Sequence, residues 1–263
     1  RYWLPLGGVR WDLLPEWISN AELYYLPSRL SFNLAPDRVR SHSVNRHLVR
    51  IDNYTCYLTQ RVGLGYRPLE SLSSDYDLRL KRDSRWAHPH RLEFGREVAR
   101  WQTLSLSYRP YLFSWSSQNF SYQVHYHEDN DILSRAGAFS GRNVESSVTR
   151  TLRLGLNPSR IMDLVLGPRS GVRPGAPYGP LDLLEWGIRR TTTVSVTLRR
   201  TKRFNLYGLS GRPDIRYQLG LVDDPGVESS PGVGETNREY QARGCDLKAG
   251  FEPLRGISLT SIY

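Results

Sequence analysis

The feature that most constrains this chain is a long alternation of apolar and polar side chains between Asn53 and Arg67. The even positions are mostly apolar from Tyr54 to Tyr66, whereas the odd positions carry Thr, Arg and Gly. Successive side chains of a β-strand point to opposite faces of the sheet. This period of two therefore predicts one long strand with an apolar face and a polar face.

The same alternation recurs along the chain. It is strong at 72–81, 103–108, 120–127, 144–156 and 193–199, and weaker at 28–34, 215–221, 245–251 and 257–263. Helical periodicity is confined to short stretches near 160–166 and 180–188. We therefore predict an all-β fold, an antiparallel meander of about nine or ten long strands. Residues 1–263 are expected to form a single unit, with long loops at 157–190 and 223–242.

Composition narrows the class of protein. The 263 residues are 39% hydrophobic and 11% aromatic, too aromatic for a disordered chain and too polar for a helical membrane protein. Two cysteines exclude a disulfide-dense scaffold. The chain starts at Arg1 and contains one Met, so we interpret it as a fragment of a longer protein.

The environment of the apolar faces separates the possible architectures. A soluble sandwich or barrel buries the apolar faces inside, whereas a membrane barrel turns them toward lipid around a wet lumen. Alternation at 53–67 and 144–157 exceeds ten residues, and membrane strands need about 9–11 residues. Tyr54 and Tyr66 lie about 40 Å apart on one face, which after strand tilt approaches the spacing of two aromatic girdles. These features favour part of a large transmembrane outer-membrane β-barrel.

The alternation assigns side chains to the two faces of this barrel. The lumen-facing candidates are Thr55, Thr59, Arg61, Asp75, Asp77, Arg79, Gln123, His125, His127, Glu145, Arg153 and Thr197. The lipid-facing candidates are Tyr54, Leu58, Val62, Leu64, Tyr66, Tyr76, Leu78, Leu104, Leu106, Tyr122, Val124, Val148, Leu152, Leu154, Val194 and Val196. Arg150 is the exception, because it falls on an apolar face. Either it lies near a bilayer interface or a β-bulge changes the register there.

Several stretches, in order, resemble the SprA family, the outer-membrane translocon of the type IX secretion system, also called the gliding-motility or cell-surface protein SprA. They include LPSRLSFN, SLSSDYDL and YQLGLVDDPGV, and they lie at Tyr25–Asn33, Arg61–Lys81, Leu104–Tyr126, Gly141–Ser147 and Tyr217–Val227.

The resemblance implies a location and a set of partners. Members are very large single-chain barrels in the outer membrane of Gram-negative, Bacteroidetes-like bacteria, and folded cargo proteins pass through the lumen. Implied partners are secreted cargo, outer-membrane lipid, a small barrel shuttle protein and a periplasmic plug. On this reading the chain is a slice of the barrel wall that serves protein transport.

Catalytic and metal-binding patterns are weak. His125 and His127 share a strand face, but the spacing fixes no third ligand, so neither a metal nor a cofactor is predicted. Asp75 and Asp77 are followed on the same face by Arg79 and Lys81, which favours an ion-pair ladder over a catalytic acid pair. No nucleophile elbow or phosphate loop is present, and we predict that the chain is not an enzyme. The two cysteines are expected to be unpaired apolar fillers.

The formal charge of +10 needs an explanation. Basic residues are spread along the chain, whereas a nucleic-acid groove concentrates them beside aromatic side chains, so no nucleic acid is predicted as a partner. Cationic side chains at a barrel rim meet lipid phosphates instead. Two alternatives remain open at this point: another outer-membrane barrel of the lipopolysaccharide-assembly or porin-like kind, and a soluble β-sandwich binding module.

Overall fold

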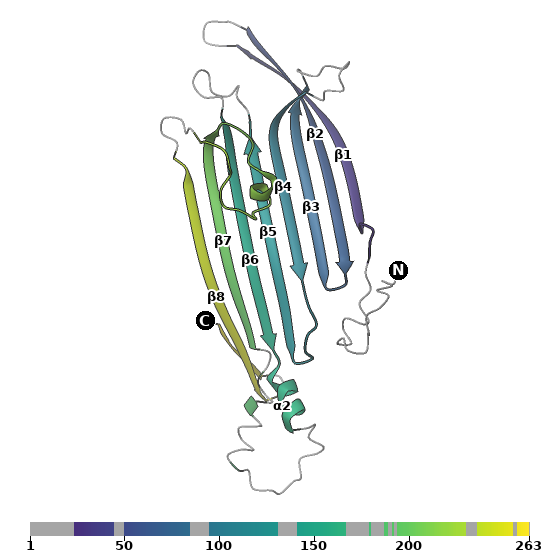
Figure 1. Cartoon of the computed structure of the whole chain (residues 1–263), viewed down its shortest axis with the longest axis vertical. Helices are drawn as coiled ribbons and strands as arrows, with labels where there is room; N and C mark the ends of the chain where they lie inside the picture. The colour runs from purple at the N-terminus through teal and green to yellow at the C-terminus, as the bar shows by residue number, and fades with distance from the viewer. Residues whose placement is uncertain are drawn as a thin grey trace.

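The structure, a computed structural model, describes residues 24–44, 50–84, 95–130, 141–166, 179, 187–188, 191, 194–229, 236–254 and 257–262. Within these ranges the chain is dominated by one β-sheet (Figure 1). The all-β antiparallel meander predicted from the alternation is confirmed.

The sheet contains nine strands whose spatial order is their order in the chain. Each neighbouring pair is antiparallel, and β1 and β9 form the two edges of the described sheet. The strands are β1 (Arg29–Val44), β2 (Arg50–Leu69), β3 (Leu72–Asp83), β4 (Arg96–Tyr108), β5 (Ser116–Asp129), β6 (Arg142–Leu156), β7 (Val194–Leu209), β8 (Arg238–Leu254) and β9 (Ile257–Ile262). Strands β1 to β8 have 12 to 20 residues, well above the roughly 5–6 of an average soluble strand.

The connection between β2 and β3 shows how one proline shapes the register. β2 continues through Pro68 to Leu69, and the turn to β3 is made by Glu70 and Ser71. The register shifts between Tyr66 and Leu69. Proline has no N–H to donate to the ladder, which accounts for a shift at this position. The Pro68 carbonyl instead accepts a hydrogen bond from the Tyr24 amide at 2.9 Å.

Three predicted segments differ from the structure. Residues 215–221 are not a strand: they hold the short helix α4 (Ile215–Gln218), because Asp214 accepts a hydrogen bond from the Ile215 amide and caps its start. The predicted loop at 157–190 is not entirely loop: the helical stretch expected near 160–166 is confirmed as α2 (Pro158–Leu166), with proline at a first-turn position that suits it. The predicted loop at 223–242 ends earlier, since β8 begins at Arg238. No helix among the described residues is long and apolar enough to cross a membrane.

One segment leaves the sheet and folds back over it. Residues 210–229, here called the cap, connect β7 toward β8, and α4 lies within them. The two ends of the cap meet, because the Ser210 amide donates to the Glu228 carbonyl at 3.0 Å and Leu209 bridges to Ser229. Figure 1 shows the cap lying over β5 to β7 near one end of the strands. The small hydrophobic core lies between the cap and the sheet and is built from Tyr126, Val144, Leu209 and Tyr217.

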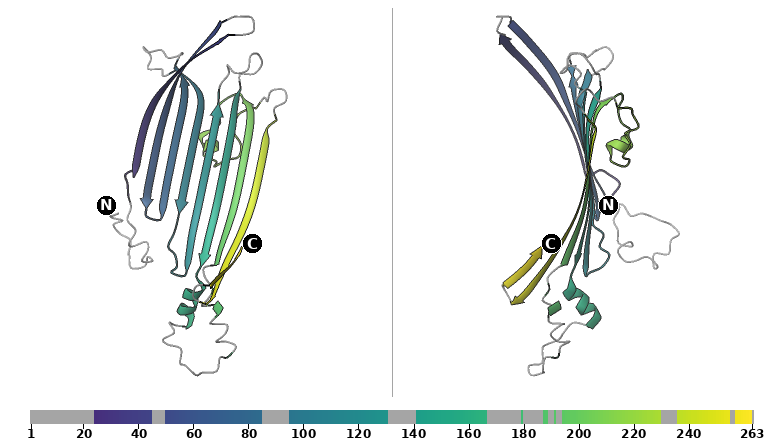
Figure 2. Two further views of the ribbon diagram at one scale, coloured as in Figure 1. Left: turned by 180° about the vertical axis from the view of Figure 1, so that it is seen from behind. Right: turned by 90° about the vertical axis from the view of Figure 1, so that its left-hand side faces the viewer.

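The sheet curves away from the cap. In the side view of Figure 2, the β1–β2 hairpin and the C-terminal strands β8 and β9 bend to one side, and the cap lies on the other. We call the side that bears the cap the cap face. It includes Leu64, Tyr76, Leu104, Val124 and Val148, which follow one another across the register from β2 to β6. The opposite, concave side is the polar face.

Candidate functional site

The cap packs the aromatic side chain of Tyr217 onto the sheet. Tyr217, only 1% exposed, lies against Tyr126, also 1% exposed, and meets Phe204 with ring centroids 6.2 Å apart. Burial, and secondarily the negative charge of Asp223, raises the pKa of the Tyr217 phenol above its ordinary value. The cap is therefore docked by a buried apolar contact.

Gly220 allows the closest approach of the cap to the sheet. Its φ of +67° lies in the left-handed region, and a Cβ there would stand 2.5 Å from Val148 Cγ2 and 2.8 Å from the Tyr122 hydroxyl oxygen. Only glycine fits this backbone geometry in this space. The sequence pattern LGL inside the cap thus has a steric cause.

Polar contacts fix the orientation of the cap. The Gln102 amide nitrogen donates to the Gln218 amide oxygen at 2.7 Å, and the Gln218 nitrogen donates to the Pro213 carbonyl at 2.7 Å. The Tyr122 hydroxyl donates to the Leu219 carbonyl at 2.7 Å. Both glutamines are buried, at 3% exposure each. These hydrogen bonds offset part of the cost of burying the two amides, since the Gln102 amide oxygen has no hydrogen-bond partner among the described residues.

A buried carboxylate anchors the start of the cap. Glu128 is fully buried and pairs with Arg142 of β6 and with Arg212 of the cap, the latter at 3.2 Å. Arg212 also reaches Glu97 of β4 at 2.6 Å. Because an unpaired buried charge is costly, the two guanidiniums and the carboxylate depend on one another. Further along the cap, Lys202 of β7 pairs with Asp223.

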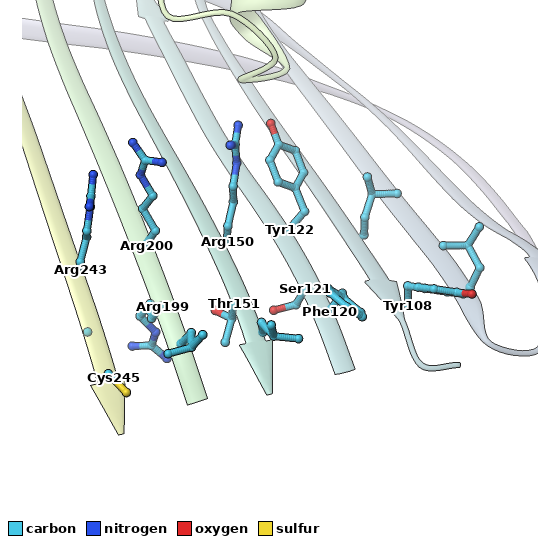
Figure 3. Close-up of a pocket in the computed structure, with 15 residues that line it drawn as sticks. Tyr108, Phe120, Ser121, Tyr122, Arg150, Thr151, Arg199, Arg200, Arg243 and Cys245 are labelled. Carbon is cyan, nitrogen blue, oxygen red and sulfur yellow. The ribbon is translucent and has the colours of Figure 1, made fainter. Parts of the chain in front are cut away.

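Three arginines form a row across the cap face beside the cap. Arg150 of β6 lies opposite Arg200 of β7, which lies opposite Arg243 of β8. We call these three residues the arginine row. The register from Val144 to Leu156 is continuous, so the alternative of a β-bulge at Arg150 is wrong. Figure 3 shows the three side chains and Tyr122 pointing the same way along the strands.

An apolar groove borders the arginine row on the side away from the cap. It has a volume of about 1030 Å³ and extends from β3 to β8, and its apolar lining includes Leu106, Tyr108, Phe120, Leu152 and Leu198. Figure 3 shows Tyr108 and Phe120 at this level, below the arginines. The aromatic rings of this pair stack with centroids 6.2 Å apart. The arrangement places a cationic strip beside an exposed apolar surface.

The predicted lumen-facing side chains lie together on the polar face. The register places Arg61 opposite Arg79, Asp77 opposite Thr103, and His127 opposite Glu145, and the other described candidates occupy the same side. They are Thr59, Asp75, Gln123, His125, Arg153 and Thr197. Thr55 lies in β2, but its side chain falls outside those the structure describes.

Ion pairs and ring contacts connect these polar side chains across strands. Arg61 binds Asp77 at 2.8 Å, and Arg29 of β1 reaches Asp75 at 3.3 Å past Gly65. The predicted ladder along β3 is therefore built from cross-strand pairs. Arg79 instead lies 5.0 Å over the Trp101 ring, and Lys81 lies 3.9 Å over the Tyr57 ring.

The two histidines of β5 have different neighbours. His127 stacks on Trp101 at 5.0 Å with an interplanar angle of 8°, and a ring nitrogen of His125 lies 3.4 Å from the Thr103 hydroxyl. Within the described residues, no group of three or more His, Cys, Asp or Glu side chains is placed to hold a metal ion. Cys56 and Cys245 lie on separate strands and form no disulfide.

The predicted lipid-facing side chains lie on the cap face, and three of them need a correction because they contact the cap. Val124 and Val148 are 1% and 6% exposed because Gly220 packs over them, so they contact protein rather than lipid. Tyr122 binds the cap through its hydroxyl. The others share this face away from the cap: Leu58, Val62, Leu64, Tyr66, Tyr76, Leu78, Leu104, Leu106, Leu152, Leu154, Val194 and Val196. The Tyr54 side chain lies outside those described.

Sequence reasoning missed the residues that assemble only in three dimensions. Arg200 and Arg243 join Arg150 through strand register, and Gln102 meets Gln218 across 116 positions. A polar residue inside an apolar alternation was the available signal for Gln102, as it was for Arg150.

Comparison with known proteins adds no family assignment. Neither the protein-family models nor the curated proteins include a match to this chain.

Proposed function

We propose that this chain is a section of the wall of an outer-membrane β-barrel that transports proteins. In this proposal the cap face meets lipid where the cap does not cover it, and the concave polar face lines a hydrated lumen. The supporting observation is the single-layer sheet whose convex side exposes large apolar side chains. They include Leu30, Phe32, Leu64, Phe120, Leu156, Leu198 and Leu247, each 37–73% exposed.

A soluble β-sandwich accounts poorly for this surface. A sandwich covers the apolar side of one sheet with a second sheet, and all nine described strands belong to one sheet. Strands as long as β2 and β6, by contrast, suit a bilayer, since transmembrane strands need about 9–11 residues for the apolar core alone. Completing a closed wall requires further strands paired to β1 and β9, which would also remove the exposed edges.

The arginine row indicates the depth at which this wall would lie in the bilayer. A lipid-facing arginine costs about 2–4 kcal/mol at the bilayer midplane and about 0–1 kcal/mol near an interface. Three adjacent arginines therefore favour a position at the edge of the hydrocarbon. The cap, with its buried glutamine and carboxylate contacts, then lies outside the hydrocarbon.

The protein-transport part of the proposal rests on the resemblance to the type IX translocon family. The matching stretches fall on distinct parts of the fold: the start of β1, the β2–β3 hairpin, the β4–β5 pair, the start of β6 and the cap. The proposed partners are secreted cargo on the polar face and outer-membrane lipid on the cap face, with a small barrel shuttle protein and a periplasmic plug as further partners.

Site-directed spin labelling of the full-length protein in membranes tests the orientation of the wall. With Cys56 and Cys245 replaced by serine, single cysteines are placed at Leu152, Leu154 and Val196 on the cap face and at Arg153, Ser195 and Thr197 on the polar face. We expect labels on the cap face to collide mainly with dissolved oxygen, and those on the polar face with an aqueous nickel chelate. Equal aqueous exposure of both faces would contradict a lipid-facing wall.

The transport role needs a separate test in the producing cell. Depletion of the full-length protein should leave proteins with a C-terminal secretion signal inside the periplasm, while other outer-membrane proteins assemble normally. Unchanged secretion after depletion would remove the transport role without affecting the barrel architecture.

A further inference from the structure

We propose that the arginine row and the apolar groove beside it bind a lipid whose headgroup carries phosphate. The inference rests on the proposed function, because the cap face must meet a bilayer for such a lipid to reach the groove. It adds a specific ligand class and a defined site to that wall.

The first step is the uncompensated charge of the arginine row. Among the described residues, no carboxylate forms an ion pair with Arg150, Arg200 or Arg243. The side chains they contact directly are neutral. Arg150 lies 5.6 Å over the Tyr122 ring, and the Gln241 amide oxygen, in its hydrogen-bonded orientation, accepts from Arg200 and Arg243 at 3.1–3.2 Å. Together with the adjacent Lys202–Asp223 pair, this strip carries four cations and one carboxylate, a net charge of 4 − 1 = +3.

The second step is the geometry of the donors. Neighbouring strands lie about 4.8 Å apart, so three guanidiniums in register present a continuous set of N–H donors. A guanidinium group can donate two parallel hydrogen bonds to two oxygens of one phosphate group, which is stronger than one hydrogen bond to a single acceptor atom. Because all three side chains extend in one direction (Figure 3), one or two phosphate groups can contact all of them.

The third step is the surface next to the donors. The groove is lined by Leu106, Phe120, Leu152 and Leu198 immediately beyond the arginines, on the side away from the cap. Phe120 and Leu198 are 45% and 43% exposed. Inorganic phosphate makes no favourable contact with this apolar lining, whereas acyl chains gain free energy by covering it. Charge and apolar surface in this order match the headgroup and chains of an anionic lipid.

The test measures which lipids the full-length protein retains. Protein purified in neutral detergent is incubated with mixed micelles of equimolar phosphatidylglycerol and phosphatidylcholine, isolated again, and its retained lipids are quantified by mass spectrometry. The R150Q/R200Q/R243Q variant removes the arginine row. Its matched control, R153Q/R203Q/R238Q, removes one arginine from the polar side of each of the same three strands.

We expect the wild type and the control to retain phosphatidylglycerol in preference to phosphatidylcholine. The preference should fall at least about tenfold in R150Q/R200Q/R243Q, since one lost charge-assisted hydrogen bond corresponds to roughly a factor of ten. The single variant R200Q, which interrupts the row at its centre, should show an intermediate preference and serves if the triple variant does not assemble. Equal loss in R153Q/R203Q/R238Q, or an unchanged preference in the variants of the row, would overturn the proposal.

Inorganic phosphate separates a lipid site from a simple anion site. Added as a competitor, it should displace little phosphatidylglycerol, because it cannot contact the groove. Displacement at concentrations similar to those of the lipid would overturn the lipid assignment. Spin labels that report lipid contact, combined with no selectivity for phosphatidylglycerol, would defeat this inference alone. Labels that report water on the cap face would defeat the proposed function as well.

Discussion

The cap face has two regions that carry the same alternation but meet different surroundings. Near the cap, Val124, Tyr126 and Val148 are at most 6% exposed and contact a second layer of the same chain. Further along the same strands, Phe120 and Leu156 are 45% and 39% exposed, with no described layer over them. Alternation therefore identifies an apolar face, but it does not identify what covers that face.

The polar side chains of the cap face distinguish the two regions better than its apolar side chains do. The capped region contains buried polar groups with partners inside the protein, such as Gln102 with Gln218. The arginine row separates it from the bare region, where apolar side chains dominate. Substitutions in the capped region should therefore change how tightly the cap docks, and substitutions outside it should not.

Removal of the buried carboxylate should give the largest effect. Glu128→Ala leaves Arg142 and Arg212 without their shared partner. Loss of one partner from a buried pair costs about 3–5 kcal/mol, so the cap should open. Hydrogen exchange of the full-length protein, followed by mass spectrometry of peptides from residues 210–229, measures this opening.

The matched control for Glu128 is Glu145 on the polar face. Glu145 is exposed, and its substitution by alanine should change stability by no more than about 0.5 kcal/mol. If Glu128→Ala left the exchange of the cap as slow as Glu145→Ala does, the buried cluster would not be what anchors the cap.

Two glycines with the same backbone conformation separate strain from steric conflict. Gly220 and Gly226 have φ of +67° and +68°, but a Cβ at Gly220 would stand 2.5 Å from Val148, whereas a Cβ at Gly226 meets nothing within 4 Å. Gly226→Ala should cost about 1 kcal/mol from the left-handed backbone alone. Gly220→Ala should cost about 1–3 kcal/mol more, because it overpacks the interface. Equal exchange rates in the two variants would mean that the cap is not seated against Val148.

The strands and the existence of two faces were predictable from the sequence, because strand side chains alternate whatever their neighbours are. The cap was not. Ile215, Tyr217, Leu219 and Leu221 also alternate over seven residues, a length at which a strand and a short helix followed by a turn give the same pattern. The signals against a strand were Pro213-Asp214 before the segment and Gly220 inside it, which suit a capped helix and a left-handed turn.

The arginine row could not be predicted from the sequence for a different reason. Arg150 was visible as an exception within its own strand, but Arg200 and Arg243 gain meaning only when three strands are aligned. That alignment depends on the connections between strands, including the long segment between Leu156 and Val194. Periodicity within one strand contains no information about such register.

Two tyrosines on the cap face test a single hydrogen bond of the cap, for which we expect a smaller effect on cap opening. Tyr122→Phe removes the hydroxyl that donates to the Leu219 carbonyl at 2.7 Å. This substitution should lower the free energy of cap opening by about 1 kcal/mol. Tyr108→Phe, on the bare region, should leave cap exchange unchanged. Similar effects of the two substitutions would indicate a general loss of stability rather than a contact specific to the cap.

The smallest effect is expected on the polar face. Asp77→Asn breaks the pair with Arg61 at 2.8 Å, whose side chains are 63% and 34% exposed. Exposed ion pairs contribute about 0–1 kcal/mol and are screened by salt, so the variant should differ slightly from the wild type at low ionic strength and not at high ionic strength. The melting temperature of the full-length protein in detergent, measured at two salt concentrations, checks this. A large effect insensitive to salt would show that the polar face is not hydrated, and it would reverse the assignment of the two faces.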